Sequence, residues 1–240
     1  MVLKLVFISQ GGEWHIRRRW VSMKATLQQL YGISEDLTEQ LTQVGTFRIF
    51  SRGKYLGFQG EAPDALYLPL DGILSLQAPF ESRDDYFYAV FCAGIPVNEL
   101  FLLNPQPRLE SLKALTDVTL LSVPLSKARE LMGVSLEFSH LMMKSLSQKL
   151  YAFGSLTYIQ SEKNPEQKIL KCLQQLARLN PRNRVYLNYR NIASLMVISR
   201  NTVAKVVKEL HSRGVLVVEK SYITFPEQSE LCQAPSHSLH

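Results

Sequence analysis

A chain of 240 residues, 46% of them hydrophobic, is long enough for one or two packed domains and does not have the composition of a disordered protein. Its formal net charge is +6. That charge is uneven, because residues 161–226 hold twelve basic and four acidic side chains while residues 23–160 hold eleven basic and fourteen acidic ones. The basic excess therefore lies in the C-terminal third, as a phosphate-binding surface requires.

Cysteine usage and the apolar runs indicate a cytoplasmic protein with no membrane partner. The three cysteines show no metal-binding or redox spacing, and they are Cys92, Cys172 and Cys232. No apolar run approaches the length of a membrane span, and residues 1–8 are too short for a signal segment. Residues 1–22 show neither helical nor strand periodicity, so we expect either a disordered N-terminal extension or an artefact of the assigned start site, and we assign it no function.

Residues 23–133 are expected to form a β-rich domain that begins with a helix. The helical pattern covers residues 23–44 and is interrupted at Gly32. Short segments of strand character follow, separated by turn residues, at 47–50, 55–58, 66–70, 73–78, 86–92, 111–115 and 118–123. Closely spaced short strands of this kind favour a barrel or a sandwich.

After a short helix at 126–132, a long helix is expected over residues 134–160, and the segment 134–163 is assigned to dimerisation. Its large apolar side chains cover more than one face of the helix. The simplest partner for the second face is the same helix of another subunit. The side chains expected at that seam are Met143, Leu146, Leu150 and Phe153. The alternative is a monomer in which neighbouring elements cover both faces.

Residues 164–226 are expected to form a second domain, followed by a tail at 227–240. Asn164 and Pro165 are a typical helix cap and first helical residue. A second helix follows a cap at Asn188, and a third follows a cap at Ser199. Two short strands, at residues 215–218 and 222–225, read as a hairpin beside the helices.

The helix after Ser199 carries the strongest functional signal of the chain. Its apolar residues follow helical spacing, and the opposite face is small, polar and cationic. Two short helices joined by a tight turn, with such a face on the second, are typical of a helix-turn-helix that enters the major groove. The predicted DNA-binding residues are Ser199, Arg200, Asn201, Thr202, Lys205 and Lys208. A small helical bundle with a solvated basic face is the alternative.

In this order, the elements resemble the family of the cyclic-AMP receptor protein and the fumarate-nitrate regulator, the Crp-Fnr family. Matching segments occur at residues 59–61, 66–67 with 71–72, 98–100, 114–118 and 199–203. The resemblance implies an α+β fold with a cyclic-nucleotide-binding-like jelly roll (β-roll), a long dimerisation helix and a C-terminal winged helix-turn-helix. It further implies a homodimer that binds double-stranded DNA at a near-palindromic promoter site and contacts RNA polymerase.

The resemblance also locates an effector pocket, and there the sequence departs from the cyclic-AMP-binding members. Those members clamp the nucleotide with a Gly-Glu pair and an Arg-Ser or Arg-Thr pair, where this chain has Asn98-Glu99 and Arg108-Leu109. Leu109 removes a hydroxyl donor, and Glu110 adds a negative charge beside the phosphate site. Phe153-Gly154 replaces the Thr-Ser pair that receives adenine. We therefore expect no control by cyclic AMP, and either a relic pocket or one for another small-molecule effector.

Two further departures concern the predicted helix-turn-helix. Relatives that resemble the cyclic-AMP receptor read DNA with an Arg-Glu pair and a second Arg, where this chain has Arg200-Asn201 and Lys205. Asn201 offers an adenine reader in place of an acceptor for cytosine, so a different half-site is expected. Val197 occupies the turn position where many relatives have Gly.

No cofactor, metal or catalytic set is expected. No cysteine cluster precedes Cys92, and the histidines are scattered. The chain also has no Ser-His-acid order and no phosphate-binding loop. We therefore predict a DNA-binding regulator and not an enzyme. The alternative is a small-ligand-binding regulatory module that acts through protein partners.

Overall fold

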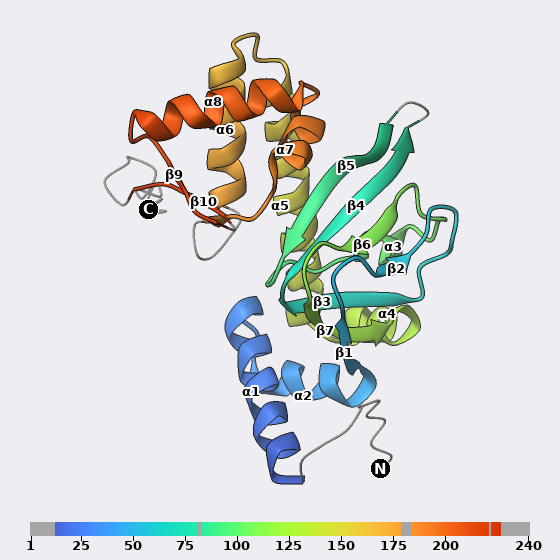
Figure 1. Ribbon diagram of the computed structural model, residues 1–240. Helices are drawn as coiled ribbons and strands as arrows, with labels where there is room; N and C mark the ends of the chain where they lie inside the picture. Colours follow the sequence, from blue (N-terminus) through green and yellow to red (C-terminus); the bar gives the residue numbers. More distant parts are fainter. Residues whose placement is uncertain (1–12, 81–82, 179–183, 221, 227–240) are drawn as a thin grey trace, which may run out of the picture. The chain divides into compact units, whose positions relative to one another are not determined.

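The computed structural model describes residues 13–80, 83–178, 184–220 and 222–226, without the side chains of residues 13–21 and 78–88 (Figure 1). The chain divides into two compact units. The first contains Met1–Pro79 and Tyr88–Lys149, and the second contains Phe80–Phe87 and Leu150–His240. The tail at 227–240 and the first twelve residues lie outside the described part of the chain.

The first unit begins with two helices, α1 (Glu13–Tyr31) and α2 (Glu35–Val44). The start of α1 corrects the expectation of a disordered extension up to residue 22, because residues 13–22 are helical. Leu27 and Tyr31 are buried, and a helix held by packing at one end can propagate outward from it. Ser34 caps α2, since its hydroxyl accepts a hydrogen bond from the backbone N–H of Leu37.

The β-roll consists of two antiparallel sheets, as the strand pattern predicts (Figure 1). One sheet has the order β1-β7-β3, and the other has the order β2-β6-β4-β5. The strands are β1 (Thr46–Phe50), β2 (Tyr55–Gly57), β3 (Ala65–Asp71), β4 (Ile73–Phe80), β5 (Arg83–Cys92), β6 (Ser111–Ala114) and β7 (Val118–Pro124). Gly72 joins β3 to β4 with φ of 88°, and a Cβ atom there would lie 2.2 Å from the carbonyl oxygen of Asp117. Only glycine fits this turn.

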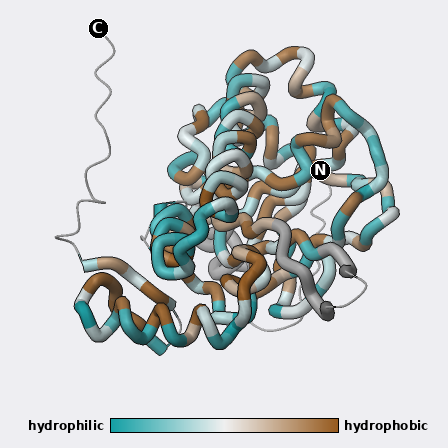
Figure 2. The backbone as a smooth tube through the Cα atoms, turned by 90° about the horizontal axis from the view of Figure 1, so that it is seen from above, coloured by the Kyte–Doolittle hydropathy of each residue, from teal (hydrophilic) through white to brown (hydrophobic). Residues whose placement is uncertain are grey.

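The first unit also contains α3 (Leu100–Leu103), α4 (Leu125–Val134) and most of α5 (Leu136–Gln160). Helix α5 continues into the second unit from Leu150. The main apolar core joins α1, α2, β3, β7, α4 and the start of α5, with Phe138 and Met142 fully buried. The sequence pattern predicted α4 and α5 but not the single turn α3. Hydrophobic and hydrophilic residues alternate along the helical turns in Figure 2, as expected of elements with one buried face.

The second unit contains the end of α5, a three-helix group and a small sheet. Its further elements are α6 (Pro165–Arg178), β8 (Arg184–Val185), α7 (Tyr189–Met196), α8 (Arg200–Ser212), β9 (Val217–Val218) and β10 (Ile223–Thr224). The predicted hairpin is present as β9 and β10, and β10 also pairs with β8, a strand of two residues that the sequence pattern did not reveal. None of the helices that the structure describes has the length and apolarity required to span a bilayer.

Candidate functional site

Helices α7 and α8 form a helix-turn-helix in which each helix has a side-chain cap. The Asn188 side chain accepts a hydrogen bond from the N–H of Asn191 at 2.9 Å, and Ser199 Oγ accepts one from the N–H of Thr202 at 3.0 Å. Ser199 Oγ also lies 2.7 Å from Thr202 Oγ1. Two of the six predicted DNA-binding side chains, Ser199 and Thr202, therefore contact each other and fix the start of α8.

The turn between the two helices depends on Val197. This residue adopts the left-handed conformation, with φ of 55° and ψ of 46°, and its side chain is 58% exposed. The next N–H, of Ile198, donates to the carbonyl of Ala193 at 3.0 Å. The turn that relatives build with Gly is thus formed here by a β-branched residue, at a cost in backbone strain of about 1–3 kcal/mol.

Helix α8 separates its side chains into a buried apolar face and an exposed polar face. Val203, Val206, Val207 and Leu210 are buried. The exposed residues of the opposite face are Arg200, Asn201, Lys205 and Lys208. The first acidic residue of α8 is Glu209, in its last turn. The predicted reading face is therefore present, accessible and cationic over most of its length.

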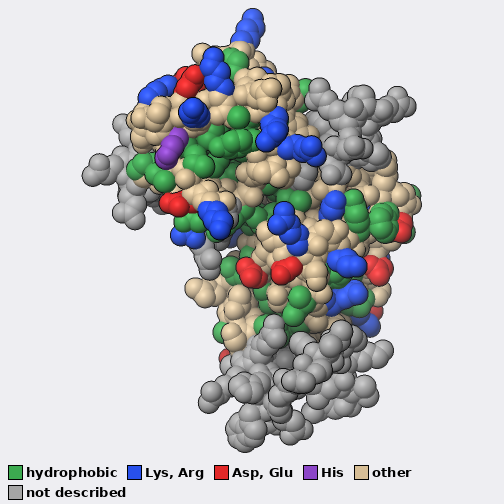
Figure 3. Space-filling model, in the orientation of Figure 1, with side chains coloured by type: hydrophobic (Ala, Val, Ile, Leu, Met, Phe, Trp, Pro, Cys, Tyr) green, Lys and Arg blue, Asp and Glu red, His purple; other side chains and the backbone are tan. Residues whose placement is uncertain are grey.

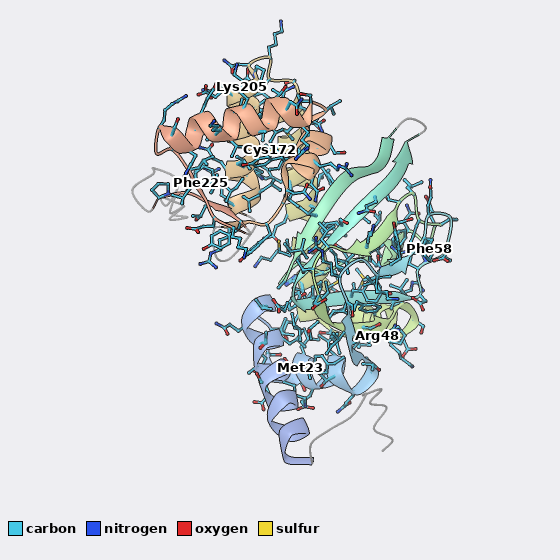
Figure 4. The ribbon with its side chains drawn as sticks, in the orientation of Figure 1. Met23, Arg48, Phe58, Cys172, Lys205 and Phe225 are labelled. Atoms are coloured by element: carbon cyan, nitrogen blue, oxygen red, sulfur yellow. The ribbon has the colours of Figure 1, made fainter. Side chains whose placement is uncertain are left out.

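The cations of the reading face form no salt bridge with another described residue, whereas Arg213 beyond the end of α8 pairs with Glu166 at 2.8 Å. Figure 3 shows Lys and Arg side chains gathered over the α6–α8 region, with few acidic side chains among them. In Figure 4, Lys205 lies on the side of α8 away from Cys172, which is buried beneath the helix. Unpaired exposed cations on a helix can bind an anionic partner without first breaking an internal contact.

The β9–β10 hairpin, the wing of the helix-turn-helix, adds basic residues to this surface, and the sequence pattern did not predict them as part of the site. A hollow of about 650 Å³ lies between the start of α7, the start of α8 and the β9–β10 turn. Its charged lining residues are Arg190, Arg200, Lys220 and one acid, Glu219, and its aromatic lining residues are Tyr186, Tyr189 and Tyr222. The Arg184 guanidinium lies 4.3 Å from the centre of the Tyr222 ring. The basic residues of the first α7 turn and of the hairpin could have indicated this surface.

In the first unit, Glu99 of the predicted effector pocket is buried within a polar network. Its side chain is 1% exposed. Ser145 Oγ of α5 donates to Oε1 at 2.7 Å, and Lys149 Nζ lies 2.6 Å from Oε1 and 2.7 Å from Oε2. Lys149 also donates to the carbonyl of Pro96 at 2.6 Å and lies 4.4 Å from the centre of the Phe91 ring. Both carboxylate oxygens are therefore already occupied by side chains of α5.

Burial lowers the pKa of Lys149, and the neighbouring Glu99 carboxylate partly opposes that effect. The ammonium stabilises a carboxylate that would otherwise be buried without a counter-charge. With its side chain 1% exposed, Glu99 presents almost no surface to a ligand hydroxyl. No local sequence signal pairs Glu99 with side chains found 46 and 50 residues later.

Arg108, the predicted phosphate-binding residue, also points inward. It is 5% exposed, and its Nη1 donates to Asn98 Oδ1 at 3.0 Å. Asn98 Nδ2 in turn donates to the carbonyl of Ala65 at 2.7 Å, and the Asn98 backbone has φ of 78°. Burial lowers the pKa of Arg108, whereas nearby Tyr67 and the carboxylates of Asp64, Glu61 and Glu110 raise it. Asn98, which stands where the cyclic-AMP-binding members have glycine, thus accepts a hydrogen bond from the Arg108 guanidinium.

Leu109 and Phe153 are the two remaining residues of the predicted effector pocket. Leu109 is 73% exposed, unlike the buried Arg108 beside it. Phe153 belongs to the second compact unit and is half-buried on α5.

The predicted dimer residues lie along α5 at two levels of exposure. Met143 is 52% and Leu150 is 75% exposed, whereas Leu146 and Phe153 are half-buried. Leu136, seven residues before Met143, is 71% exposed. Exposed apolar residues at intervals of seven are the pattern of a coiled-coil seam.

The described residues contain no cluster of three or more His, Cys, Asp or Glu side chains able to hold a metal ion. The Cys172 thiol is fully buried, and burial raises its pKa to about 12. A thiol with such a pKa is almost entirely protonated at neutral pH, so Cys172 is a core residue.

Comparison with known proteins agrees with this architecture. Residues 47–134 match the family model described as the cyclic nucleotide-binding domain. The chain is 23% identical over 184 residues to the global nitrogen regulator of Nostoc sp., covering 73% of this chain and 82% of that protein. It is 26% identical over 173 residues to the cyclic AMP receptor protein of Thermus thermophilus, covering 70% and 78%.

Among solved structures, the c-di-GMP-responsive global regulator CLP of Xanthomonas campestris has the same fold. Its TM-score is 0.65 at 18% identity, and the match covers 80% of this chain and 99% of that one. The names of these relatives describe regulators and a receptor protein. The chain therefore contains a cyclic nucleotide-binding domain over residues 47–134, and with its capped helix-turn-helix it is similar to the Crp-Fnr family of transcription regulators.

Proposed function

We propose that this protein is a transcription regulator that binds double-stranded DNA through α8. The observation that carries the proposal is the exposed face formed by Arg200, Asn201, Lys205 and Lys208, which has no acidic partner among the described residues. In this role Arg200 presents its fork to a guanine edge, and Asn201 pairs with an adenine edge. Lys205 and Lys208 contact bases or phosphates, and the cations of the wing hold the flanking backbone.

The site is bound as a homodimer, which makes the DNA sequence near-palindromic. Support comes from the apolar stripe of α5, in which Met143 and Leu150 are more than half exposed. Light scattering is expected to give the mass of two chains. Leu150→Glu, which places a charge at the seam, should shift that mass toward one chain, whereas Gln148→Glu on an exposed position of the same helix should not. A single-chain mass for the unaltered protein would contradict the dimer.

The β-roll does not respond to cyclic AMP. Support comes from Glu99, whose two oxygens are bonded to Ser145 and Lys149, and from Arg108, which bonds to Asn98. Cyclic AMP and c-di-GMP occur in the names of two relatives. These names describe the effectors of those two proteins and not the effector of this chain. Contact with RNA polymerase follows from the family resemblance and is part of the proposal.

Selection of bound DNA from a random duplex pool tests the proposal. The purified full chain is used alone, with cyclic AMP and with c-di-GMP. We expect a near-palindromic motif in all three selections, with no change in affinity on addition of cyclic AMP. Arg200→Ala should lose the motif, whereas Arg213→Ala, which removes a paired arginine at the far end of α8, should keep it. A protein that binds a cyclic nucleotide but no duplex would support the alternative of a module acting through protein partners.

A further inference from the structure

A second cavity lies wholly within the second unit, between the last turns of α5 and the helix α6. Its volume is about 460 Å³, within the size range of small-molecule sites in proteins. Helix α5 contributes Tyr151, Gly154, Ser155, Tyr158 and Ile159, and α6 contributes Lys171, Gln174, Gln175 and Arg178. None of these residues belongs to the reading face or to the Glu99 network.

Two tyrosines form the aromatic walls of this cavity. Tyr151 is 75% and Tyr158 is 72% exposed, and seven residues separate them, so they lie on one face of α5 about 10 Å apart along its axis. Gly154 lies between them, and a Cβ atom at that position would meet nothing within 4 Å. Tyr151 comes one residue after Leu150 of the seam and so lies about 100° around the helix from it. Tyr158, seven residues later, lies on the same face as Tyr151, outside the seam of a two-stranded coiled coil. Two large exposed rings around open space indicate a binding site.

The α6 side of the cavity is cationic and rich in amides. Lys171 lies 5.9 Å from the centre of the Tyr158 ring and pairs with Glu162, outside the lining, at 2.8 Å. Arg178, seven residues further along the same face of α6, has no salt-bridge partner in the part of the chain that the structure describes. The nine lining residues include no carboxylate. The cavity therefore favours an anion over a neutral or basic ligand.

We propose that this cavity binds a small aromatic acid, a planar ring that carries a carboxylate or a phosphate. The ring packs against Tyr151 or Tyr158 above Gly154, and the acidic group accepts hydrogen bonds from Arg178. Lys171 stays paired with Glu162 and contributes its charge at the edge of the site. The side-chain amides of Gln174 and Gln175 provide further polar contacts at the edge of the ring. A ligand held in this way contacts both α5 and α6 and fixes the position of one helix against the other.

Isothermal titration of the full chain tests the site with two acids and their uncharged counterparts. The probes are indoleacetate with indoleacetamide, and adenosine monophosphate with adenosine. We expect at least one acid to bind roughly tenfold more tightly than its uncharged counterpart, because a charge-assisted hydrogen bond contributes about 1.5 kcal/mol or more. Indoleacetate alone would assign the carboxylate class, and adenosine monophosphate alone would assign the phosphate class.

Three variants locate the binding. Arg178→Met, at an exposed position, should weaken the acid roughly tenfold. Gly154→Leu should abolish binding, because its side chain fills the space between the tyrosines. Lys168→Met, on α6 but outside the lining, should leave the affinity unchanged. Circular dichroism and the unfolding midpoint confirm that each variant is folded.

Equal binding of acids and uncharged counterparts, no binding of either acid at millimolar concentration, or full binding by Arg178→Met would overturn the proposal. The proposal would also be overturned if the unaltered protein binds neither acid and Gly154→Leu lowers the mass in light scattering from two chains to one. In that case a second copy of the chain occupies the cavity. The titration contains no DNA, so its failure and the failure of the proposed function are separate results.

Discussion

The β-roll and the helix-turn-helix both present arginine, asparagine and lysine side chains, but the two regions use them differently. In the roll, Asn98, Arg108 and Lys149 bond to other groups of the same chain, and the first two are 5% exposed. On α8, Arg200, Asn201 and Lys205 are exposed and form no ion pair with a described residue. The same residue types stabilise the fold in one region and are available to a partner in the other.

Because of this difference, a sequence motif predicts ligand-binding side chains more reliably on α8 than in the roll. A motif shows which side chains are present and not whether they are already engaged. Satisfied buried polar groups contribute to a unique packed structure and resist displacement, since leaving one unpaired costs its full desolvation. Exposed unpaired cations lose only solvent and counterions when they bind. The comparison therefore predicts large stability effects in the roll and large binding effects on α8.

The largest expected effect is on the Glu99–Lys149 pair. Lys149→Met leaves the Glu99 carboxylate buried without its counter-charge and should lower the free energy of unfolding by about 3–5 kcal/mol. Urea unfolding followed by circular dichroism measures the change. Lys144→Met, at an exposed position of the same helix, should change it by less than about 0.5 kcal/mol.

A double variant sharpens this test. Glu99→Gln together with Lys149→Met removes both charges, so it should be more stable than Lys149→Met alone. If Lys149→Met costs no more than Lys144→Met, the pair is not the internal stabiliser that the comparison requires. The Glu99 position would then be accessible to a ligand.

The next effect concerns sequence selectivity at Arg200. Arg200→Ala should cost about 1–3 kcal/mol on the selected duplex and little on a scrambled one, because the guanidinium binds a base edge. Titration of both duplexes by fluorescence anisotropy measures the two affinities. Equal losses on both duplexes would show that Arg200 contacts phosphate and that another residue reads the base.

Lys208 should show the opposite behaviour with a smaller effect. Lys208→Ala is expected to weaken all duplexes alike and to reduce the slope of log K against log salt by about 0.9 for each phosphate that the variant no longer neutralises. Anisotropy at four or more salt concentrations gives the slope. Arg213→Ala is the control, because Arg213 is already paired with Glu166. An unchanged slope for Lys208→Ala would remove this lysine from the interface.

Periodicity and caps were sufficient to predict most of the fold. The strands of the roll, the break at Asn164 and Pro165, and the caps Asn188 and Ser199 are local signals, and the structure contains each of them. The start of α1, the single turn α3 and the two-residue strand β8 were missed. Such short or extended elements depend on packing and pairing with distant segments, which local periodicity does not report.

The candidate sites were predictable to different degrees. The reading face of α8 is a property of one helix, so helical spacing alone predicted which side chains are exposed. One set of hydrogen bonds joins Asn98, Arg108 and Ala65, and a second set joins Glu99 to α5, and no spacing rule links the members of either set. Resemblance supplied the residues, but only the structure shows that their hydrogen bonds are already made.

The smallest expected effect concerns Asn98 and Val197, the two non-glycine residues with positive φ among those that the structure describes. Val197→Gly should raise the free energy of unfolding by about 1 kcal/mol, because relief of the left-handed strain exceeds the entropy that glycine adds to the unfolded chain. The exposed Val197 side chain contributes little packing, and its backbone hydrogen bonds to Ala193 and Ser194 do not need a side chain. Asn98→Gly relieves similar strain but loses bonds to Ala65 and Arg108 worth about 1 kcal/mol each, so it should not stabilise the protein. Urea unfolding of both variants gives the sign of each change in the free energy of unfolding. Stabilisation by Asn98→Gly would show that backbone strain at Asn98 outweighs its hydrogen bonds to Ala65 and Arg108.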